Sequence, residues 1–225
     1  MSQHIEENVG SRASQVFVQL QEAIVRGEIK AGTKLREADL SQEYGISRAP
    51  LREALNRLES LKLVVKVPHV GAQVVNLTAR EVQEIYLIRE NLEALACRLA
   101  AVEMTQTELD ELKQLLHQHE QYIQDQSGSR YLLQQDDLDF HYCIIQGSRN
   151  QMLVNLLCNE LYQLVRMIRH SGILVRNTPA KALQEHWRIY EALSQRDGEL
   201  AAMLMQRHIS RARQSAHLIQ VEDQV

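Results

Sequence analysis

Hydrophobic residues near the start of the chain recur at the spacing of a helix. Val16, Leu20 and Ile24 lie four residues apart and the pattern ends at Gly27, which is typical of one amphipathic helix. Two shorter helical patterns follow it, separated by Gly45. The sequence therefore predicts three helices, over residues 16–26, 37–44 and 47–61.

The pattern then changes from helical spacing to runs of β-branched residues. Two such runs, at 63–67 and 72–75, flank the segment Pro68-His69-Val70-Gly71, whose glycine allows the backbone angles of a tight turn. We expect three helices followed by a β-hairpin over residues 10–76, after a flexible N-terminus at 1–9.

The rest of the chain is a series of amphipathic helices with recognisable starts. Thr78 and Thr105 each stand three residues before a glutamate, the spacing of a capping box, and Pro179 and Asp197 suit the first positions of helices. An all-α antiparallel bundle is expected over residues 77–221. Its six predicted helices span residues 79–104, 105–125, 130–146, 150–171, 179–195 and 198–220, before a tail at 222–225.

Composition supports a mostly α protein and limits where nucleic acid could bind. The 225 residues include only 9 Gly and 3 Pro, too little turn material for a many-stranded barrel or sandwich. The formal net charge is −4, but residues 10–76 carry ten Lys or Arg against seven Asp or Glu. Any nucleic-acid binding is therefore expected from this basic segment rather than from the acidic remainder.

Cysteine usage and the N-terminal residues indicate a cytoplasmic protein. Cys97, Cys143 and Cys158 lie in helical patterns without Cys-x-x-Cys spacing, so we expect buried thiols in a reducing compartment. The first residues lack the apolar block of a secretory signal, and no segment approaches the roughly 18 apolar residues of a membrane span. No membrane partner is expected.

A helix, a tight turn at Gly45 and a second helix beginning at Ser47 have the outline of a helix-turn-helix motif. Arg48 and Arg52 share one face of the second helix, where a guanidinium fork suits guanine O6 and N7 or a phosphate. Alternatively, both arginines form the solvated face of an ordinary amphipathic helix. Their spacing alone leaves both interpretations open.

The residues around this motif resemble the winged-helix domain of GntR-family transcriptional regulators. The resemblance extends from about Gln15 to Val75 and is carried by Leu35-x-Glu37-x-x-Leu40 and by Ser47-Arg48-x-Pro50-Leu51-Arg52. Ala38 and Lys62 stand where relatives often have arginine and glycine, so the resemblance does not imply a particular operator sequence. The DNA contacts that it implies are Arg36, Ser47, Arg48, Pro50, Arg52, His69 and Gly71.

Four residues of the helical part form a candidate metal site. Asp137 and His141 lie four residues apart on one helical face, where both could bind one ion. Such a pair is more often a surface hydrogen bond. A single histidine in an amphipathic helix, such as His186 or His208, is usually a packing residue. Their joint pattern resembles the FCD ligand-binding domain of one GntR branch. That resemblance implies that Asp137, His141, His186 and His208 bind one divalent metal, with Zn²⁺ preferred and Ni²⁺, Fe²⁺ or Mn²⁺ as alternatives.

The first predicted helix of this part carries a candidate effector site. The segment from Tyr86 through Arg89 to Glu93 resembles the FCD pattern Tyr-x-x-Arg-x-x-Leu-Glu, which implies that Tyr86 and Arg89 contact a small organic acid. Alternatively, Arg89 pairs with Glu93 on a solvated helix face.

The two resemblances together imply a ligand-responsive regulator with no catalytic residues. They imply a homodimer that binds a near-palindromic double-stranded DNA operator and, in most relatives, a repressor released by its effector. Two alternatives remain open. One is a regulator whose metal is purely structural, and the other is a metal-dependent enzyme fused to a DNA-binding domain.

Overall fold

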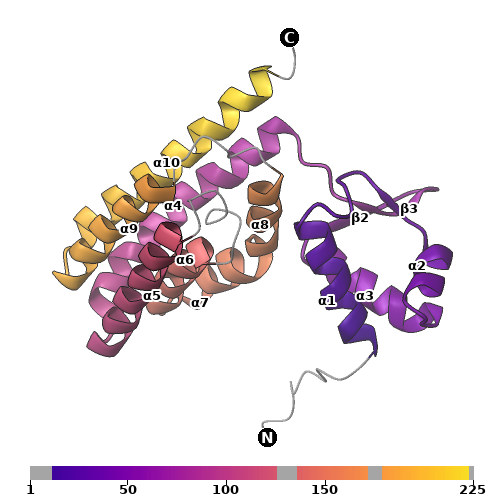
Figure 1. Ribbon diagram of the computed structural model, residues 1–225, viewed down its shortest axis with the longest axis horizontal. Helices are drawn as coiled ribbons and strands as arrows, with labels where there is room; N and C mark the ends of the chain where they lie inside the picture. Colours follow the sequence, from indigo (N-terminus) through magenta and orange to yellow (C-terminus); the bar gives the residue numbers. More distant parts are fainter. Residues whose placement is uncertain (1–11, 126–135, 172–178, 223–225) are drawn as a thin grey trace, which may run out of the picture. The chain divides into compact units, whose positions relative to one another are not determined.

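The computed structural model describes residues 12–125, 136–171 and 179–222 (Figure 1). Contacts within the chain divide it after Asn76 into two compact units. Among the described residues, no helix is both long enough and apolar enough to cross a membrane.

Three helices form most of the first unit, as the hydrophobic pattern predicts. They are α1 (Arg12–Val25), α2 (Glu37–Glu43) and α3 (Arg48–Ser60). The apolar faces of α1 and α3 pack against each other, which removes their hydrophobic side chains from water and stabilises the unit. The core side chains include Leu20, Ile24, Leu51 and Leu58, all at most 1% exposed.

A three-stranded antiparallel sheet completes the first unit. The predicted hairpin consists of β2 (Val64–Val67) and β3 (Gly71–Val74). The sequence did not predict a third strand, but β1 (Lys34–Leu35) pairs with β3 and gives the order β1-β3-β2. Two residues are too short for a strand pattern to be recognised in the sequence.

Lys62, the first residue after the C-terminal cap of α3, adopts the left-handed backbone conformation, with φ of 58°. Glycine reaches this conformation without steric cost, whereas a side chain disfavours it. The glycine that the GntR resemblance leads us to expect at this position would therefore have a structural reason. Lys62 keeps the same turn, and its backbone N–H donates to the Glu59 carbonyl oxygen at 2.9 Å.

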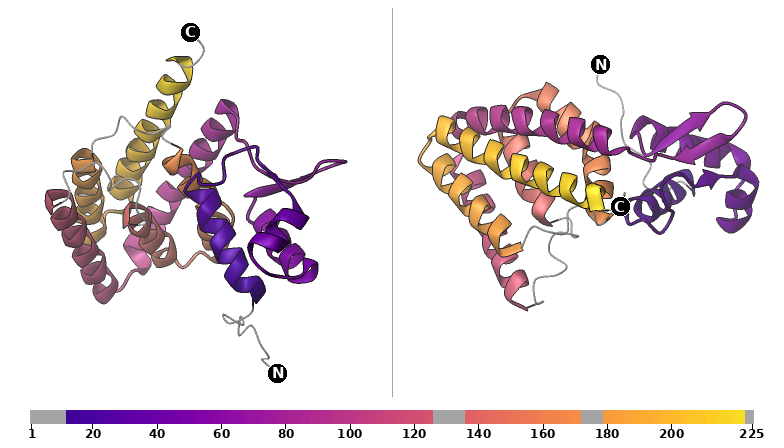
Figure 2. Two further views of the ribbon diagram at one scale, coloured as in Figure 1. Left: turned by 45° about the vertical axis from the view of Figure 1, so that its right-hand side comes forward. Right: turned by 90° about the horizontal axis from the view of Figure 1, so that it is seen from above.

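The second unit is a bundle in which α4 is the central helix. It packs against α6, α9 and α10, while α5 packs against α6 and α9, and Figure 2 shows α10 running alongside α4. The long helices are α4 (Ala79–Glu103), α5 (Gln106–Asp125), α6 (Asp136–Gly147), α9 (Pro179–Ser194) and α10 (Gly198–Glu222).

The predicted helix starts at Thr78, Thr105, Pro179 and Asp197 are confirmed, whereas the start expected at residue 130 lies outside the described residues. Thr78 and Thr105 each form a capping box with the glutamate three residues later. The Asp197 carboxylate accepts from the backbone N–H of Leu200 at 2.9 Å at the start of α10, and α9 begins at Pro179. Local hydrogen bonding therefore fixes where these helices begin.

The helix expected over 150–171 is not one continuous α-helix. It consists of α7 (Gln151–Leu153), the π-helical segment η2 (Val154–Glu160) and α8 (Tyr162–His170). Across the junction the Leu161 N–H donates to the Leu156 carbonyl at 3.0 Å, five residues back. A π-helical turn is wider than an α-helical turn and so changes which side chains face inward. Leu157 before the junction and Leu164 after it are both buried.

Candidate metal centre and DNA-reading surface

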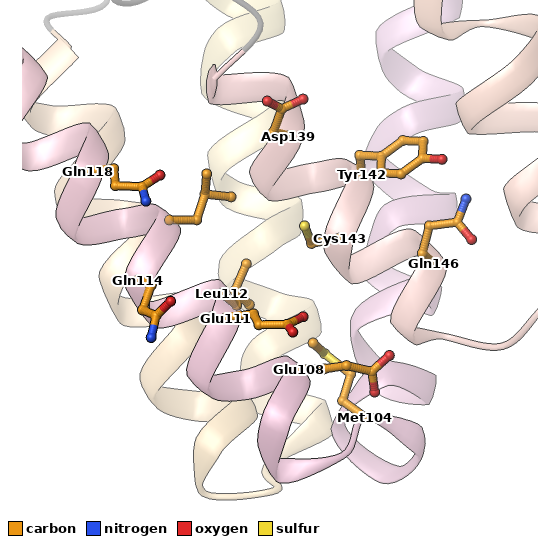
Figure 3. Close-up of a pocket in the computed structure, with 11 residues that line it drawn as sticks. Met104, Glu108, Glu111, Leu112, Gln114, Gln118, Asp139, Tyr142, Cys143 and Gln146 are labelled. Atoms are coloured by element: carbon orange, nitrogen blue, oxygen red, sulfur yellow. The ribbon is translucent and has the colours of Figure 1, made fainter.

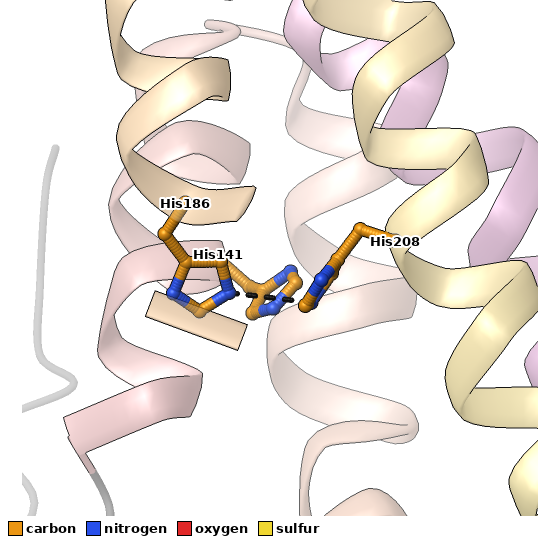
Figure 4. Close-up of side chains that lie close together, drawn as sticks. All are labelled: His141, His186 and His208. Carbon is orange, nitrogen blue, oxygen red and sulfur yellow. Dashed lines mark hydrogen bonds between the residues drawn. The ribbon is translucent and has the colours of Figure 1, made fainter. Parts of the chain in front are cut away.

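Three of the four predicted metal ligands meet inside the helical unit. His141 comes from α6, His186 from α9 and His208 from α10 (Figure 4). One nitrogen atom from each imidazole lies within 4.8 Å of the other two, and all three residues are buried. Asp137 belongs to the first turn of α6, but its side chain lies outside the described residues.

Two carboxylates orient two of these imidazoles. His141 Nδ1 lies 2.6 Å from Glu93 Oε2, and His208 Nδ1 lies 2.8 Å from Glu185 Oε2. Because a carboxylate only accepts hydrogen bonds, each Nδ1 carries the proton and each Nε2 keeps a lone pair. His186 Nε2 lies 3.2 Å from His208 Nε2, so ring nitrogen atoms of these two histidines also face each other.

Each of the two carboxylates is also paired with an arginine. Arg89 Nε donates to Glu93 Oε1 at 2.7 Å, with side chains only 4% and 3% exposed, and Arg211 pairs with Glu185. Burial alone would raise the pKa of Glu93, but its interactions with the Arg89 guanidinium and the His141 imidazole outweigh burial and lower that pKa to about 2. Glu93 is therefore a permanently ionised hydrogen-bond acceptor for His141.

The three-histidine cluster has the properties that a divalent metal requires of its ligands. Burial lowers the pKa of His141 below 6.5, against the opposing effect of Glu93, which favours the neutral imidazole that binds metals. The Nε2 atom of His141 is buried and has no hydrogen-bond partner among the described residues. Neutral imidazoles held by carboxylates are a common arrangement around Zn²⁺ and similar ions, so these residues fit such an ion.

One of the predicted effector residues, Arg89, is linked to the histidine cluster by Glu93, which contacts both Arg89 and His141. Arg89 does pair with Glu93, but both side chains are buried, so the alternative of a pair on a solvated helix face is wrong. The Arg89 guanidinium carbon also lies 5.0 Å from the centre of the Tyr86 ring. Tyr86 is completely buried, and its hydroxyl has no hydrogen-bond partner among the described residues.

In the first unit, the predicted DNA contacts at the start of α3 are mostly exposed. Ser47 is the N-cap of α3, as predicted, but its side chain makes no capping hydrogen bond. Arg48 and Arg52 are exposed and Pro50 is half-buried. Arg36, the N-cap of α2, is exposed and its Nη1 lies 4.0 Å from Asp39 Oδ2.

The remaining two predicted contacts form the turn of the hairpin. His69 and Gly71 are exposed and have positive φ angles of 63° and 97°. The hairpin is attached to α3 by Lys66, whose ammonium group donates to Asn56 Oδ1 at 3.0 Å and pairs with Glu59. These contacts hold the hairpin against the C-terminal half of α3.

A groove of about 420 Å³ lies between α5 and α6, on a part of the helical unit that the sequence did not single out (Figure 3). Cys143 lines it and is half-buried, so the expectation of three buried thiols is wrong for this residue and holds for Cys97 and Cys158. None of the predicted site residues lines this groove, which includes Glu111, Tyr142 and Gln146.

The sequence did not identify Glu93, Glu185 or Arg211 as part of the metal centre. Glu93 lies 48 residues from His141 along the chain, and Glu185 lies 23 residues from His208. Only the position of Arg211, three residues after His208 on the same helix, gave a local signal.

The first unit is thus a winged helix-turn-helix and the second an all-α bundle with a buried histidine cluster. Residues 12–74 match the bacterial regulatory proteins of the gntR family, and residues 84–211 match the FCD domain. The chain belongs to the GntR family of bacterial regulatory proteins, in the branch that carries an FCD domain. It is a DNA-binding transcriptional regulator and not an enzyme.

Similar proteins agree with this membership. The chain is 32% identical over 198 residues to the uncharacterized HTH-type transcriptional regulator YdhC of Bacillus subtilis, covering 87% of each. It is 33% identical to the gluconate operon transcriptional repressor of Bacillus licheniformis, covering 67% of this chain and 62% of that protein. The solved structure of Escherichia coli McbR/YncC superposes with a TM-score of 0.70 at 26% identity, covering 91% and 98% of the two chains.

Proposed function

We propose that this regulator is a repressor whose helical unit binds one divalent metal ion and a small organic acid, which together change its affinity for operator DNA. The observation that carries the proposal is the buried cluster of His141, His186 and His208 with its carboxylate partners. The name of the Bacillus licheniformis gluconate operon repressor supports both repression and an acid as the signal. As a bacterial DNA-binding protein, the chain would act in the cytoplasm.

The metal would be held by His141, His186 and His208, with Asp137 as the fourth ligand. Three imidazoles and one carboxylate suit Zn²⁺ in first place and also Ni²⁺, Fe²⁺ or Mn²⁺. When bound, the ion supplies a positive charge in a buried site and open coordination positions that a carboxylate can fill. The carboxylates Glu93 and Glu185 hold two of the imidazoles in the orientation that the ion needs.

The acid would be recognised by Arg89 and Tyr86 together with the metal. Arg89 can donate from its terminal nitrogen atoms while its Nε remains bound to Glu93. The buried Tyr86 hydroxyl, which lacks a hydrogen-bond partner among the described residues, is a further donor. A neutral apolar ligand would leave these groups unsatisfied, whereas a hydroxy acid such as gluconate would satisfy them.

A second copy of the chain would cover an exposed apolar face of α4. Ile88, Leu95 and Val102 are exposed, Val102 by 78%, and they lie seven residues apart on one side of the helix. Arg98, on the same side of the helix, pairs with Glu199 of α10 at 2.8 Å. The positive charge of Arg98 is therefore already neutralised within one chain. Pairing through such a face would give the two-fold symmetry that a near-palindromic operator requires.

We propose that α4 transmits the effect of metal and acid binding to the predicted DNA contacts of the winged helix. This helix carries Arg89 and Glu93 and begins at Ala79, five residues after the last strand of the winged helix. A ligand that favours one arrangement of α4 would change the separation of the two α3 helices in the dimer. Such coupling typically changes DNA affinity by about 5- to 150-fold.

Metal content and ligand-dependent melting test the proposal. Wild-type protein, the His141→Ala/His208→Ala double variant and a His117→Ala control would be compared, since His117 is exposed and lies outside the cluster. We expect about one metal per wild-type and control chain and none in the double variant. Gluconate or citrate should raise Tm only in the two metal-containing proteins, because a ligand that binds only the folded state stabilises it.

Three results would count against this proposal in different ways. If wild-type protein neither retains nor rebinds a metal ion, the metal site is wrong. If it retains the metal but no acid changes Tm or DNA affinity, the metal is structural, and the effector roles of Arg89 and Tyr86 fail. An Arg89→Lys variant that responds to acid like the wild type would also argue against Arg89 as the acid-binding residue.

A further inference from the structure

The exposed surface of the winged helix contains one ion pair that involves a predicted DNA-reading side chain. Arg52 lies in the second turn of α3, and its Nε donates to Oε2 of Glu37 at 2.8 Å. Glu37 is the first residue of α2 and lies 15 residues earlier in the chain. The pair therefore crosses the turn that separates the two helices of the helix-turn-helix motif.

The contact uses only one edge of the Arg52 guanidinium. The group is planar and has five N–H donors, of which only the Nε–H is engaged by Glu37. No other partner of Arg52 is found among the described residues, and 62% of its side chain is exposed. The two terminal nitrogen atoms are therefore available as a fork, which is the arrangement that binds guanine O6 and N7.

We propose that Glu37 is a positioning residue for sequence recognition: it does not contact DNA but fixes the Arg52 guanidinium so that its terminal fork faces a base pair. A free arginine side chain would lose several rotamers on binding DNA and could reach a phosphate as easily as a base. Restricting Arg52 beforehand would favour base reading over phosphate binding. This inference rests on the proposed DNA-contact role of Arg52.

A simpler role for Glu37 is to stabilise α2, because an acidic residue in the first turn of a helix interacts favourably with the helix dipole. Asp39 lies in the same turn of α2 and has the same charge. Its carboxylate is exposed and lies 4.0 Å from Arg36, at the outer limit of an ion pair. Asp39→Asn is therefore a matched control for loss of charge and of helix-dipole stabilisation.

The experiment compares sequence preference, not only affinity. Wild-type protein would select duplexes from a random-sequence pool, and Kd would then be measured for the selected duplex, its single-base variants and a scrambled duplex. The proteins are wild type, Glu37→Ala, Glu37→Gln, Asp39→Asn, Arg52→Ala and the Glu37→Ala/Arg52→Ala double variant. Circular dichroism and Tm would check that these exposed substitutions leave the fold unchanged.

We expect Glu37→Ala to reduce the preference for the selected duplex over the scrambled one by roughly 3- to 5-fold, the effect that one exposed ion pair can have. The lost preference should fall, in each half-site, at the base pair whose recognition Arg52→Ala also removes. Glu37→Gln, which keeps an oxygen acceptor, should lose less. In the Arg52→Ala background, removal of Glu37 should change sequence preference less than twofold, because the pair acts as one unit. Asp39→Asn should strengthen binding to both duplexes similarly.

Three outcomes would overturn the inference. Glu37→Ala could change affinity for both duplexes equally, as Asp39→Asn does, which would reveal a charge effect only. Alternatively, its effect on sequence preference could persist fully without Arg52, which would assign Glu37 a different target. If wild-type protein selects no sequence from the pool, the sequence-reading role of α3 fails together with that of Glu37.

Discussion

The two units of this regulator use their charged side chains in opposite ways. In the winged helix, Arg52 and Glu37 form an ion pair with 62% and 36% of their side chains exposed. In the helical unit, Arg89 and Glu93 form a pair that is almost completely buried. Water already screens the exposed pair, so its arginine can add a contact to a base at little cost. The buried pair cannot separate without leaving a charge unsolvated, which makes it a rigid support for His141.

The largest effect expected from this difference is on stability. Glu93→Ala leaves the buried Arg89 without its carboxylate and should lower the free energy of unfolding by about 3–5 kcal/mol. For a protein of this size that corresponds to a fall in Tm of roughly 6–20 °C. Urea denaturation and calorimetry would measure both quantities.

The matched control for that experiment is Glu37→Ala, which breaks the exposed pair in the other unit. It should cost less than about 1 kcal/mol. Equal losses of stability in Glu93→Ala and Glu37→Ala would contradict the distinction between the two pairs.

The next effect concerns DNA affinity and is limited to the winged helix. Arg52→Ala should weaken binding to the selected duplex by roughly 5- to 150-fold, because one bidentate base contact contributes about 1–3 kcal/mol. Arg80→Ala removes an exposed arginine at the start of α4 that pairs with Glu84 and should change Kd by less than about threefold. Fluorescence anisotropy at one fixed salt concentration provides the comparison, and similar losses for both variants would indicate a nonspecific charge effect.

A third effect concerns metal affinity in the helical unit. Glu185→Gln should weaken metal binding by about 10- to 100-fold, since a carboxylate that orients a histidine ligand typically contributes that much. Glu90→Gln is the control, because Glu90 pairs with Arg213 of α10 at 3.2 Å, and the structure gives it no contact with the histidine cluster. Competition with a chromophoric chelator would measure both affinities, and equal values for wild type and Glu185→Gln would remove Glu185 from the site.

The smallest expected effect depends on pH. Thr105→Ala removes the two hydrogen bonds that the Thr105 hydroxyl makes with Glu108 in the capping box at the start of α5 and should cost about 1 kcal/mol at pH 7. Hydrogen bonds from Thr105 lower the pKa of Glu108 below 4.5. The part of the stabilisation that depends on this carboxylate is therefore complete above pH 4.5 and is lost as the pH falls through the lower pKa of the folded state. Urea titrations at pH 7 and at pH 3 should show a smaller difference at pH 3, and an increase would contradict this assignment.

Sequence reasoning succeeded where the controlling interactions are local. The capping boxes at Thr78 and Thr105 and the start of α9 at Pro179 each depend on residues within one helical turn. The three histidines were also identified correctly as a group, but through family resemblance and not through their spacing, because they lie on three different helices.

The features that the sequence did not predict depend on contacts between distant segments. β1 exists only because Lys34 and Leu35 pair with residues of β3 nearly forty positions later. The contact between Glu93 and His141 joins α4 to α6 and has no local signature. The π-helical turns of η2 also had no signal in the sequence, because its hydrophobic pattern fits an α-helix as well.

The most direct test of the account is the operator affinity of the full-length protein with and without metal and acid. The selected duplex would be titrated with Zn²⁺-loaded protein and with protein stripped by a chelator, each with and without gluconate and citrate. We predict that at least one acid changes Kd by about 5- to 150-fold in the Zn²⁺-loaded protein, and by less than twofold in the stripped protein or in His141→Ala/His208→Ala. A Kd that is independent of both metal and acid would contradict the proposal that the helical unit controls DNA binding.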